Sequence, residues 1–252
     1  MGLPCGPAKI MHRFFTDQAA NPGQRVMLSK EDAAHCLRVL RLNAGDEIEL
    51  VSSPHRFRAE IESIQDGEVH CRVMESLPST EAKHGVILFQ GLPKSERMDY
   101  IVQKATELGI EKIVPVMMIR SVVRLEAKEG EKKAVRWGKI AREAVKQCGR
   151  TVVPQISAPL SFQEALKEME KADVLLVPWE DAHEGGIAEI LKEADCRTVG
   201  IVIGPEGGIS QEEIRKMESI GGRTVTMGPR ILRVDTAATA AICLAMQALG
   251  EL

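Results

Sequence analysis

Between residue 86 and the carboxyl terminus, short apolar segments alternate with amphipathic segments of helical period. The apolar segments are GVILFQGL, KIVPVMM, ADVLLVPWE, VGIVIGPEGG and TVTMG. This order predicts a mainly parallel sheet with helices on both faces, because parallel strands need helical connections. It places residues 86–252 in the α/β class. Ligand sites in such sheets lie at the carboxyl ends of the strands.

Two of the helical segments carry clear end signals. In SERMDYIVQKATELG, Ser95 can cap the helix and Gly109 can end it. SQEEIRKMESIGG begins with a capping box from Ser210 to Glu213. The buried stripe of the first helix is expected to consist of Met98, Ile101, Val102 and Ala105.

Residues 12–77 have a different pattern, with short alternating runs such as HRFRAEIESI around one helix. The helix is predicted to start after Ser29, a good N-cap, and to end at Gly45. We therefore expect a small, mostly β, barrel-like domain over residues 12–77. PSTEAKHG, at 78–85, has the composition of a linker to the α/β domain at 86–252.

The composition is that of an ordinary soluble globular protein, with 44% hydrophobic and 27% charged residues and a formal net charge of −3. No segment approaches the roughly 20 apolar residues of a membrane helix, and the amino terminus lacks the pattern of a signal peptide. The six cysteines are scattered without C-x-x-C or zinc spacing. We expect free thiols, no metal and a cytoplasmic protein. Any nucleic-acid contact must be local, since the net charge gives no bulk signal.

Four loops follow strands and are expected to meet at one edge of the sheet: LPKSE, VPWED, IGPEGGIS and MGPRILRVDT. IGPEGGIS is neither a P-loop nor a dinucleotide fingerprint, because it lacks Gly-Lys-Ser/Thr and G-x-G-x-x-G. Glu206 would repel a phosphate there, but its carboxylate can accept hydrogen bonds from backbone amides or from a ligand. A tight strand-to-helix turn that binds nothing is the plain alternative.

MGPRILRVDT favours a functional edge, because Arg230, Arg233 and Asp235 gather at the end of a strand. Asp235 alone would be explained as a favourable charge at a helix N-terminus. That explanation does not account for the two arginines, Arg230 and Arg233, in the same loop. The loops VPWED and LPKSE add Trp179 and Lys94 at the same edge.

Positive charge is concentrated between residues 120 and 150, where Lys132, Arg136, Lys139, Lys146 and Arg150 fall near one helical stripe. Such a stripe is a solvated face by default, and it can also contact phosphates. HRFF at 12–15 and HRFR at 55–58 mix cations with aromatic residues, as recognition of single-stranded RNA needs, although each alone is more often structural. The residues expected to contact RNA are Arg13, Arg38, Arg41, Arg56, Lys94, Arg136, Lys139, Arg142 and Arg150.

Several segments together resemble one family. In order and spacing, HCLRVLR with GD, KATELGI, KIAREAVKQCGR with VP, IGPEGGIS with EEI, and MGPRILRVDTAATAAI are similar to the RsmE family of bacterial 16S ribosomal RNA (uracil-N3)-methyltransferases. The resemblance extends over residues 12–250, and the GPEGG and G-x-R-I-L-R segments are its specific parts. The first ten residues have no counterpart, which leaves open whether Met11 is the natural start.

The resemblance implies a SPOUT-type methyltransferase domain with a deep trefoil knot, an exception to the rule against knots. It also implies an amino-terminal PUA-like RNA-binding domain, S-adenosylmethionine as methyl donor, 16S rRNA within the small ribosomal subunit as substrate, and a homodimer with active sites at the subunit interface. The family holds this cofactor largely by backbone contacts of the knot loops. The matching residues here are Leu176, Val177, Pro178, Trp179, Ile203, Gly204, Gly207, Gly208, Met227, Gly228, Ile231 and Leu232.

The chemistry of methyl transfer to uracil N3 suggests roles for three residues. N3 belongs to a neutral imide, so it must lose a proton as it attacks. Arg233 could stabilise the imide anion, and Asp235 or Glu206 could orient or deprotonate the base. Asp235 departs from the Glu expected in the family, and Ala34 stands where the family often has a second His. An RNA-binding module without activity and a dinucleotide-dependent oxidoreductase are the alternatives.

Overall fold

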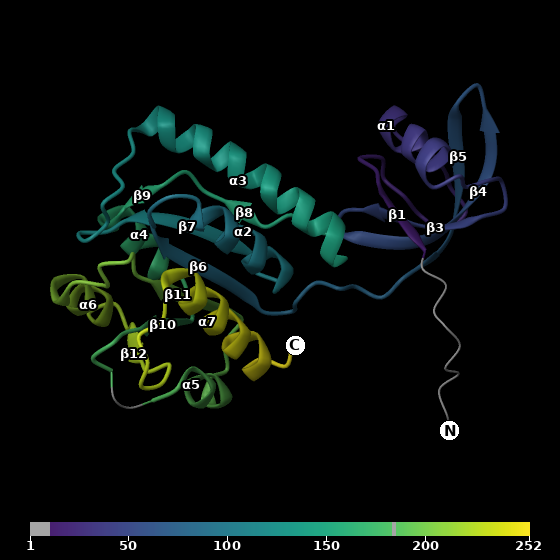
Figure 1. The fold of residues 1–252 in the computed structure, drawn as a ribbon. Helices are drawn as coiled ribbons and strands as arrows, with labels where there is room; N and C mark the ends of the chain where they lie inside the picture. Colours follow the sequence, from purple (N-terminus) through teal and green to yellow (C-terminus); the bar gives the residue numbers. More distant parts are fainter. Residues whose placement is uncertain (1–10, 183–184) are drawn as a thin grey trace. The chain divides into compact units, whose positions relative to one another are not determined.

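The computed structural model describes residues 11–182 and 185–252 (Figure 1). Residues 1–10, with Cys5 and the segment before Met11, lie outside the described part, as do residues 183–184. The chain divides into two compact units, Met1–Thr80 and Glu81–Leu252.

The first unit is built on a five-stranded sheet in the order β1-β3-β4-β5-β2. The strands are β1 (His12–Phe15), β2 (Arg25–Met27), β3 (Glu47–Ser52), β4 (His55–Gln65) and β5 (Glu68–Ser76). β1 runs parallel to β3, and the other neighbours are antiparallel. Side chains on one face, such as Phe14, Leu50 and Ile61, form the core. The predicted mostly β character is confirmed.

The helix of this unit is shorter than predicted. Ser29 caps α1 (Lys30–Ala34) by accepting a hydrogen bond from the Asp32 amide, as expected. A π-helical turn, His35–Val39, follows, and the chain leaves the helix at Arg41, whose φ of 55° is left-handed. The prediction that Gly45 ends the helix is wrong. Gly45 lies in the turn before β3, where its amide donates to the Ile61 carbonyl.

The second unit is built on a seven-stranded sheet in which every pairing is parallel. Its order is β12-β10-β11-β6-β7-β8, and β9 pairs with β7. The strands are β6 (Gly85–Gly91), β7 (Lys112–Met117), β8 (Gln155–Ile156), β9 (Leu160–Ser161), β10 (Val174–Pro178), β11 (Thr198–Ile203) and β12 (Arg223–Val225). The predicted α/β class and parallel sheet are confirmed.

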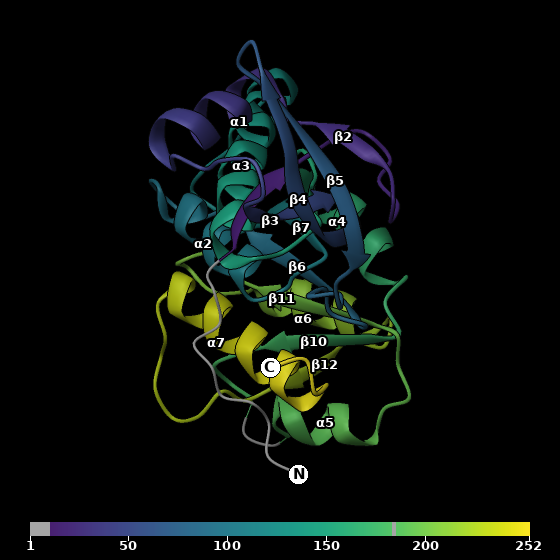
Figure 2. The same cartoon turned by 90° about the vertical axis from the view of Figure 1, so that its right-hand side faces the viewer.

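Helices cover both faces of this sheet, as the continuous apolar strands predict. Helices α2, α3, α5 and α7 pack on one face, and α4 and α6 pack on the other. α7 contacts both α2 and α5 (Figure 1, Figure 2). The helices are α2 (Arg97–Glu107), α3 (Ala127–Cys148), α4 (Phe162–Met169), α5 (Ile187–Glu193), α6 (Gln211–Glu218) and α7 (Val234–Ala248).

Helix α2 has the predicted buried stripe, and Gly109 follows its end with a φ of 92°. Its start differs from the prediction. Ser95 does not cap α2: its φ is 57°, and the N-cap is Glu96, whose side chain makes no capping bond. The amide of the residue before Ser95, Lys94, donates a hydrogen bond to Glu206. The capping box of Ser210 and Glu213 at α6 is confirmed.

Among the basic residues between 120 and 150, Arg150 differs most from its predicted position. It follows the end of α3 and is buried, so its predicted place on the solvent stripe is wrong. Its guanidinium donates to Glu81 Oε2 and to the carbonyls of Thr106 and Ile110. Arg150 therefore ties the amino-terminal end of this unit to the end of α2.

Within residues 11–182 and 185–252, none of the helices combines the length and apolar character needed to cross a membrane. In the same described part, no three His, Cys, Asp or Glu side chains converge on a possible metal position.

Candidate active site

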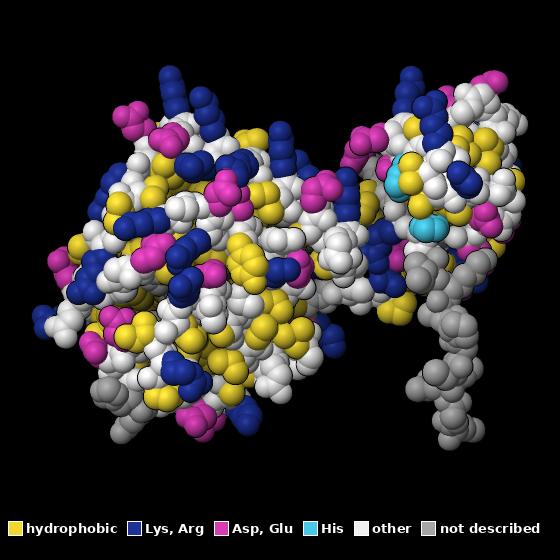
Figure 3. Space-filling model, viewed as in Figure 1, with side chains coloured by type: hydrophobic (Ala, Val, Ile, Leu, Met, Phe, Trp, Pro, Cys, Tyr) yellow, Lys and Arg dark blue, Asp and Glu magenta, His cyan; other side chains and the backbone are white. Residues whose placement is uncertain are grey.

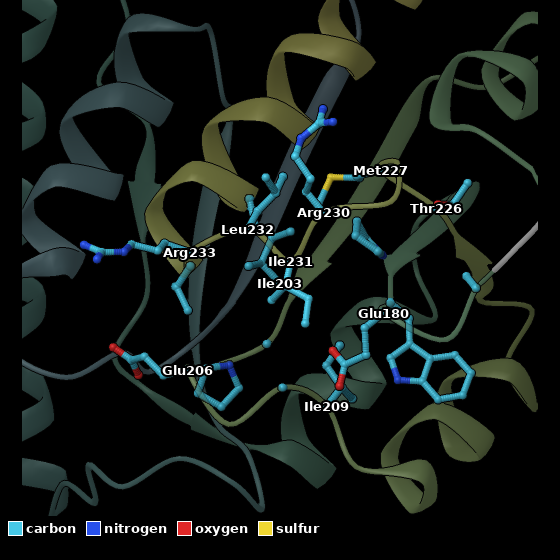
Figure 4. A pocket seen from close by; sticks show the side chains of 18 of the residues that line it. Glu180, Ile203, Glu206, Ile209, Thr226, Met227, Arg230, Ile231, Leu232 and Arg233 are labelled. Atoms are coloured by element: carbon cyan, nitrogen blue, oxygen red, sulfur yellow. The ribbon is translucent and has the colours of Figure 1, made fainter.

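The loops that follow β10, β11 and β12 surround one cavity of about 1020 Å³ (Figure 4). These three strands are neighbours, so their carboxyl ends lie at the same edge of the sheet. Arg97, at the start of α2, is also part of the lining. The cavity lies where the topology of a parallel α/β sheet places ligand sites.

Most residues predicted from the sequence to bind a cofactor line this cavity. They are Pro178, Trp179, Ile203, Gly204, Gly207, Gly208, Met227, Gly228, Ile231 and Leu232. The exceptions are Leu176 and Val177, whose side chains are buried in the two hydrophobic cores on either face of β10. A central parallel strand buries successive side chains on both faces, so only the residues at its end reach the cavity.

The loop after β11 is shaped by its glycines. Gly208 has a φ of 72°, and its amide donates to the Pro205 carbonyl. A Cβ on Gly204 would lie 2.8 Å from Ile209 Cγ1 and 3.1 Å from the Gly208 carbonyl carbon. The chain therefore folds back on itself here, and Gly204, Gly207 and Gly208 contribute backbone to the lining of the cavity.

Glu206 is held by backbone. Its Oε1 and Oε2 accept hydrogen bonds from the Lys94 amide at 3.0 and 3.2 Å. The sequence left open whether the Glu206 carboxylate accepts hydrogen bonds from backbone amides or from a ligand, and in the structure it accepts them from a backbone amide. This contact joins the loop after β11 to the loop after β6, which carries Lys94.

Arg97 is a site residue that the sequence did not single out. Its Nε lies 3.8 Å from Glu206 Oε1, and its Nη1 lies 3.7 Å from Asp235 Oδ1. Asp235 does not line the cavity itself, but Val234 and Arg233 beside it do. The available signal was that LPKSE, one of the four loops at this edge, leads directly into Arg97.

The remaining charged residues of the lining have different surroundings. Arg233, the N-cap residue of α7, and Arg230 are exposed. Figure 4 shows Arg233 and Glu206 extending to the same side of the view, whereas Arg230 extends along another direction. A Cβ on Gly208 would lie 3.0 Å from Glu180 Oε1, so this carboxylate lies against the glycine loop. The lining thus combines open backbone, apolar side chains and both signs of charge.

The chain matches known protein families over both units. The RNA methyltransferase domain matches residues 80–246, and the RNA methyltransferase PUA domain matches residues 28–74. Ribosomal RNA small subunit methyltransferase E of Bacillus subtilis is 35% identical over 90% of this chain and 93% of its own length. The chain belongs to the ribosomal RNA small subunit methyltransferase E family. Membership in this family overturns the alternative of a dinucleotide-dependent oxidoreductase, which the α/β class alone had left open.

Solved structures of similar proteins support the same assignment. A ribosomal RNA small subunit methyltransferase E from Neisseria gonorrhoeae, bound to S-adenosyl methionine, has a TM-score of 0.80 at 29% identity, covering 94% of this chain and 97% of its own. A methyltransferase from Legionella pneumophila, in complex with the cofactor SAM, has a TM-score of 0.77 at 31% identity, covering 94% and 98%.

In this methyltransferase E family member, the residues expected to contact RNA divide into two groups. Arg38, Arg41, Lys94, Lys139 and Arg142 are exposed. Figure 3 shows Lys and Arg side chains projecting along α3. Of the others, Arg13 and Arg56 pair with the buried Glu49 and Arg150 pairs with Glu81, whereas Arg136 pairs with Asp99 although its side chain is 56% exposed. The exposed group is the better candidate for phosphate contacts.

Proposed function

We propose that this protein transfers a methyl group from S-adenosylmethionine to N3 of a uridine in 16S ribosomal RNA. The observation that carries the proposal is the cavity at the carboxyl ends of β10, β11 and β12, with Arg233 on its rim and Asp235 next to it. Membership in the methyltransferase E family supports the reaction class.

The cavity fits the methyl donor. Its volume of about 1020 Å³ is at the upper end of the roughly 300–1000 Å³ of small-molecule sites. S-adenosylmethionine has no phosphate, so the carboxylates of Glu180 and Glu206 at the rim are compatible with it. Ile203, Ile209 and Met227 offer apolar surface for a purine, and Gly204, Gly207 and Gly208 line the cavity with backbone. We assign the cofactor to these residues.

The protein's part in the chemistry is to place the uracil and to manage one proton. The sulfonium supplies an electrophilic methyl group, and the N3–C bond forms as the C–S bond breaks. Asp235 accepts or directs the N3 proton, because Glu206 is already engaged by the Lys94 amide. Arg233 stabilises the negative charge that develops on the imide.

RNA reaches the site through the exposed cations, and we assign Lys139, Arg142, Arg38 and Arg41 to phosphate contacts. By family expectation, the protein acts in the cytoplasm as a homodimer on the small ribosomal subunit, and its methyltransferase domain contains a trefoil knot.

Methyl incorporation from labelled S-adenosylmethionine tests the proposal. Undermodified small subunits and naked 16S RNA are the two substrates, and at least one is expected to be labelled. Arg233→Ala should abolish labelling while keeping RNA affinity. Arg215→Ala, an exposed change on α6 outside the cavity, should leave both labelling and RNA affinity unchanged. Label in neither substrate would refute methyl transfer. If the protein then still bound both RNA and the donor, the alternative of a binding module without activity would stand.

A further inference from the structure

We infer that Arg97 is a positioning residue for methyl transfer, which acts by holding the carboxylate of Asp235. This inference rests on the proposed function and assigns a role within the same site. Arg97 is the first residue of α2, its side chain is 37% exposed, and it lines the cavity. It comes from a different element than either carboxylate near it.

The guanidinium of Arg97 lies near two carboxylates that belong to separate loops. Nη1 is 3.7 Å from Asp235 Oδ1, and Nε is 3.8 Å from Glu206 Oε1. Both separations exceed the length of a hydrogen bond, so the contacts are ion pairs. Glu206 has a second anchor in the Lys94 amide. Asp235 has no such anchor.

Arg97 is the side-chain ion-pair partner of Asp235, whose side chain is 32% exposed and which also lies in the first turn of α7. The Oδ1 atom of Asp235 is buried and has no hydrogen-bond partner among the described residues. A buried carboxylate oxygen without a partner is unfavourable, and Arg97 supplies the ion pair to this atom. A guanidinium stays protonated in proteins, so this compensation is permanent.

Removing Arg97 would take the ion pair away from both Asp235 and Glu206. The Asp235 carboxylate would then turn toward solvent, away from its present direction. Without Arg97, Glu206 would keep its hydrogen bonds from the Lys94 amide, so the glycine loop would retain an anchor and the damage should fall mainly on the transfer step. A misplacement of about 1 Å at a reacting group can cost on the order of 100-fold in rate.

The test compares Arg97→Gln, Arg97→Lys, Asp235→Asn and the double variants in single-turnover methyl transfer to the substrate that the wild type labels. We expect R97Q to lower the rate about 10- to 100-fold, with the KM for S-adenosylmethionine changed less than about 3-fold. R97K, which retains the positive charge, should recover part of the rate. In the D235N background, R97Q should cost less than about 3-fold more, because the group through which it acts is already changed.

Arg215→Gln is the matched control, since it removes an exposed arginine on α6 outside the cavity. Effects of R97Q and D235N that multiply in the double variant would overturn the inference, as would an R97Q that raises KM at unchanged rate. If R97Q fails to fold, the cycle is run with R97K, whose smaller loss of rate should likewise shrink in the D235N background; an R97K effect of equal size in both backgrounds would overturn the inference. A wild type without activity would refute the proposed function, and this inference with it.

Discussion

Replacing Arg150 with methionine is expected to destabilise the unit Glu81–Leu252 without weakening RNA binding. The guanidinium donates to Glu81 Oε2 at 2.9 and 2.7 Å, and to the carbonyls of Thr106 and Ile110 at 3.0 and 2.9 Å. Its side chain is 8% exposed, and that of Glu81 is 16% exposed. Arg150→Met removes one partner of a buried, fully bonded pair.

The size of this effect follows from what remains after the substitution. Breaking a buried ion pair by removing one partner costs about 3–5 kcal/mol. Glu81 would keep hydrogen bonds from the Thr151 amide and hydroxyl and from the Val152 amide. The carbonyls of Thr106 and Ile110 would lose their donor. We therefore expect a loss near the lower end, about 3 kcal/mol, in the free energy of unfolding.

The same network makes stability depend on pH. Burial raises the pKa of Glu81, but hydrogen bonds from Arg150 and from the Thr151 and Val152 amides outweigh it and hold the pKa below the ordinary value. A carboxyl with a lowered folded-state pKa adds stability that is complete above its ordinary pKa of about 4.3 and is lost as the pH falls through the folded-state pKa. In R150M, the loss of stability on acidification should be smaller.

Urea unfolding followed by tryptophan fluorescence measures this effect, because both tryptophans, Trp137 and Trp179, lie in the unit Glu81–Leu252. Arg215→Met, an exposed change on α6, is the control and should stay within about 0.5 kcal/mol of wild type. If R150M unfolds like the wild type but binds RNA more weakly, the structural account of Arg150 is refuted and its role as an RNA contact is restored.

Three further predictions concern the cavity and the basic helix. Gly204→Ala should lower the free energy of unfolding by about 1–3 kcal/mol and weaken S-adenosylmethionine binding in calorimetry, because its Cβ would lie 2.8 Å from a neighbouring side chain; unchanged affinity would remove this loop from the binding site. Exchanging Lys139 and Arg142 together for alanine should weaken RNA binding and reduce its salt dependence by about one to two ions, whereas an identical salt slope would make α3 a solvated face. Trp179→Phe should abolish a fluorescence change on donor binding, while a change that survives it but disappears in Trp137→Phe would contradict the place of Trp179.

Local patterns predicted most of the long elements, but not the short helices α4 and α5 or the two-residue strands β8 and β9. Continuous apolar runs predicted the parallel strands, and the capping box at Ser210 predicted the start of α6, because both depend on residues close in sequence. The order of loops at one sheet edge followed from the α/β alternation alone. This alternation placed the glycine loop after β11 at that edge, but only the family resemblance assigned it to the cofactor.

Contacts between distant segments could not be predicted. Arg150 had the spacing of a surface stripe, but its partner Glu81 lies 69 residues away and determines its burial. Ser95 had the residue type of a cap, but its φ is left-handed, and the Lys94 amide just before it bonds to Glu206, 112 residues along the chain. The sequence did not identify Arg97 as a site residue for the same reason, because its two ion-pair partners, Glu206 and Asp235, lie on other loops.

The product of the reaction tests the central claim most directly. After incubation of wild-type protein with undermodified small subunits and S-adenosylmethionine, the 16S RNA is digested to nucleosides and analysed by mass spectrometry against methyluridine standards, and the position is mapped by primer extension. Methylation of N3 removes the imide proton used in base pairing, so we expect 3-methyluridine at one position that also stops the polymerase. A methyl group on carbon 5 or on the ribose, with no 3-methyluridine, would contradict the assignment of Asp235 and Arg233 to an imide.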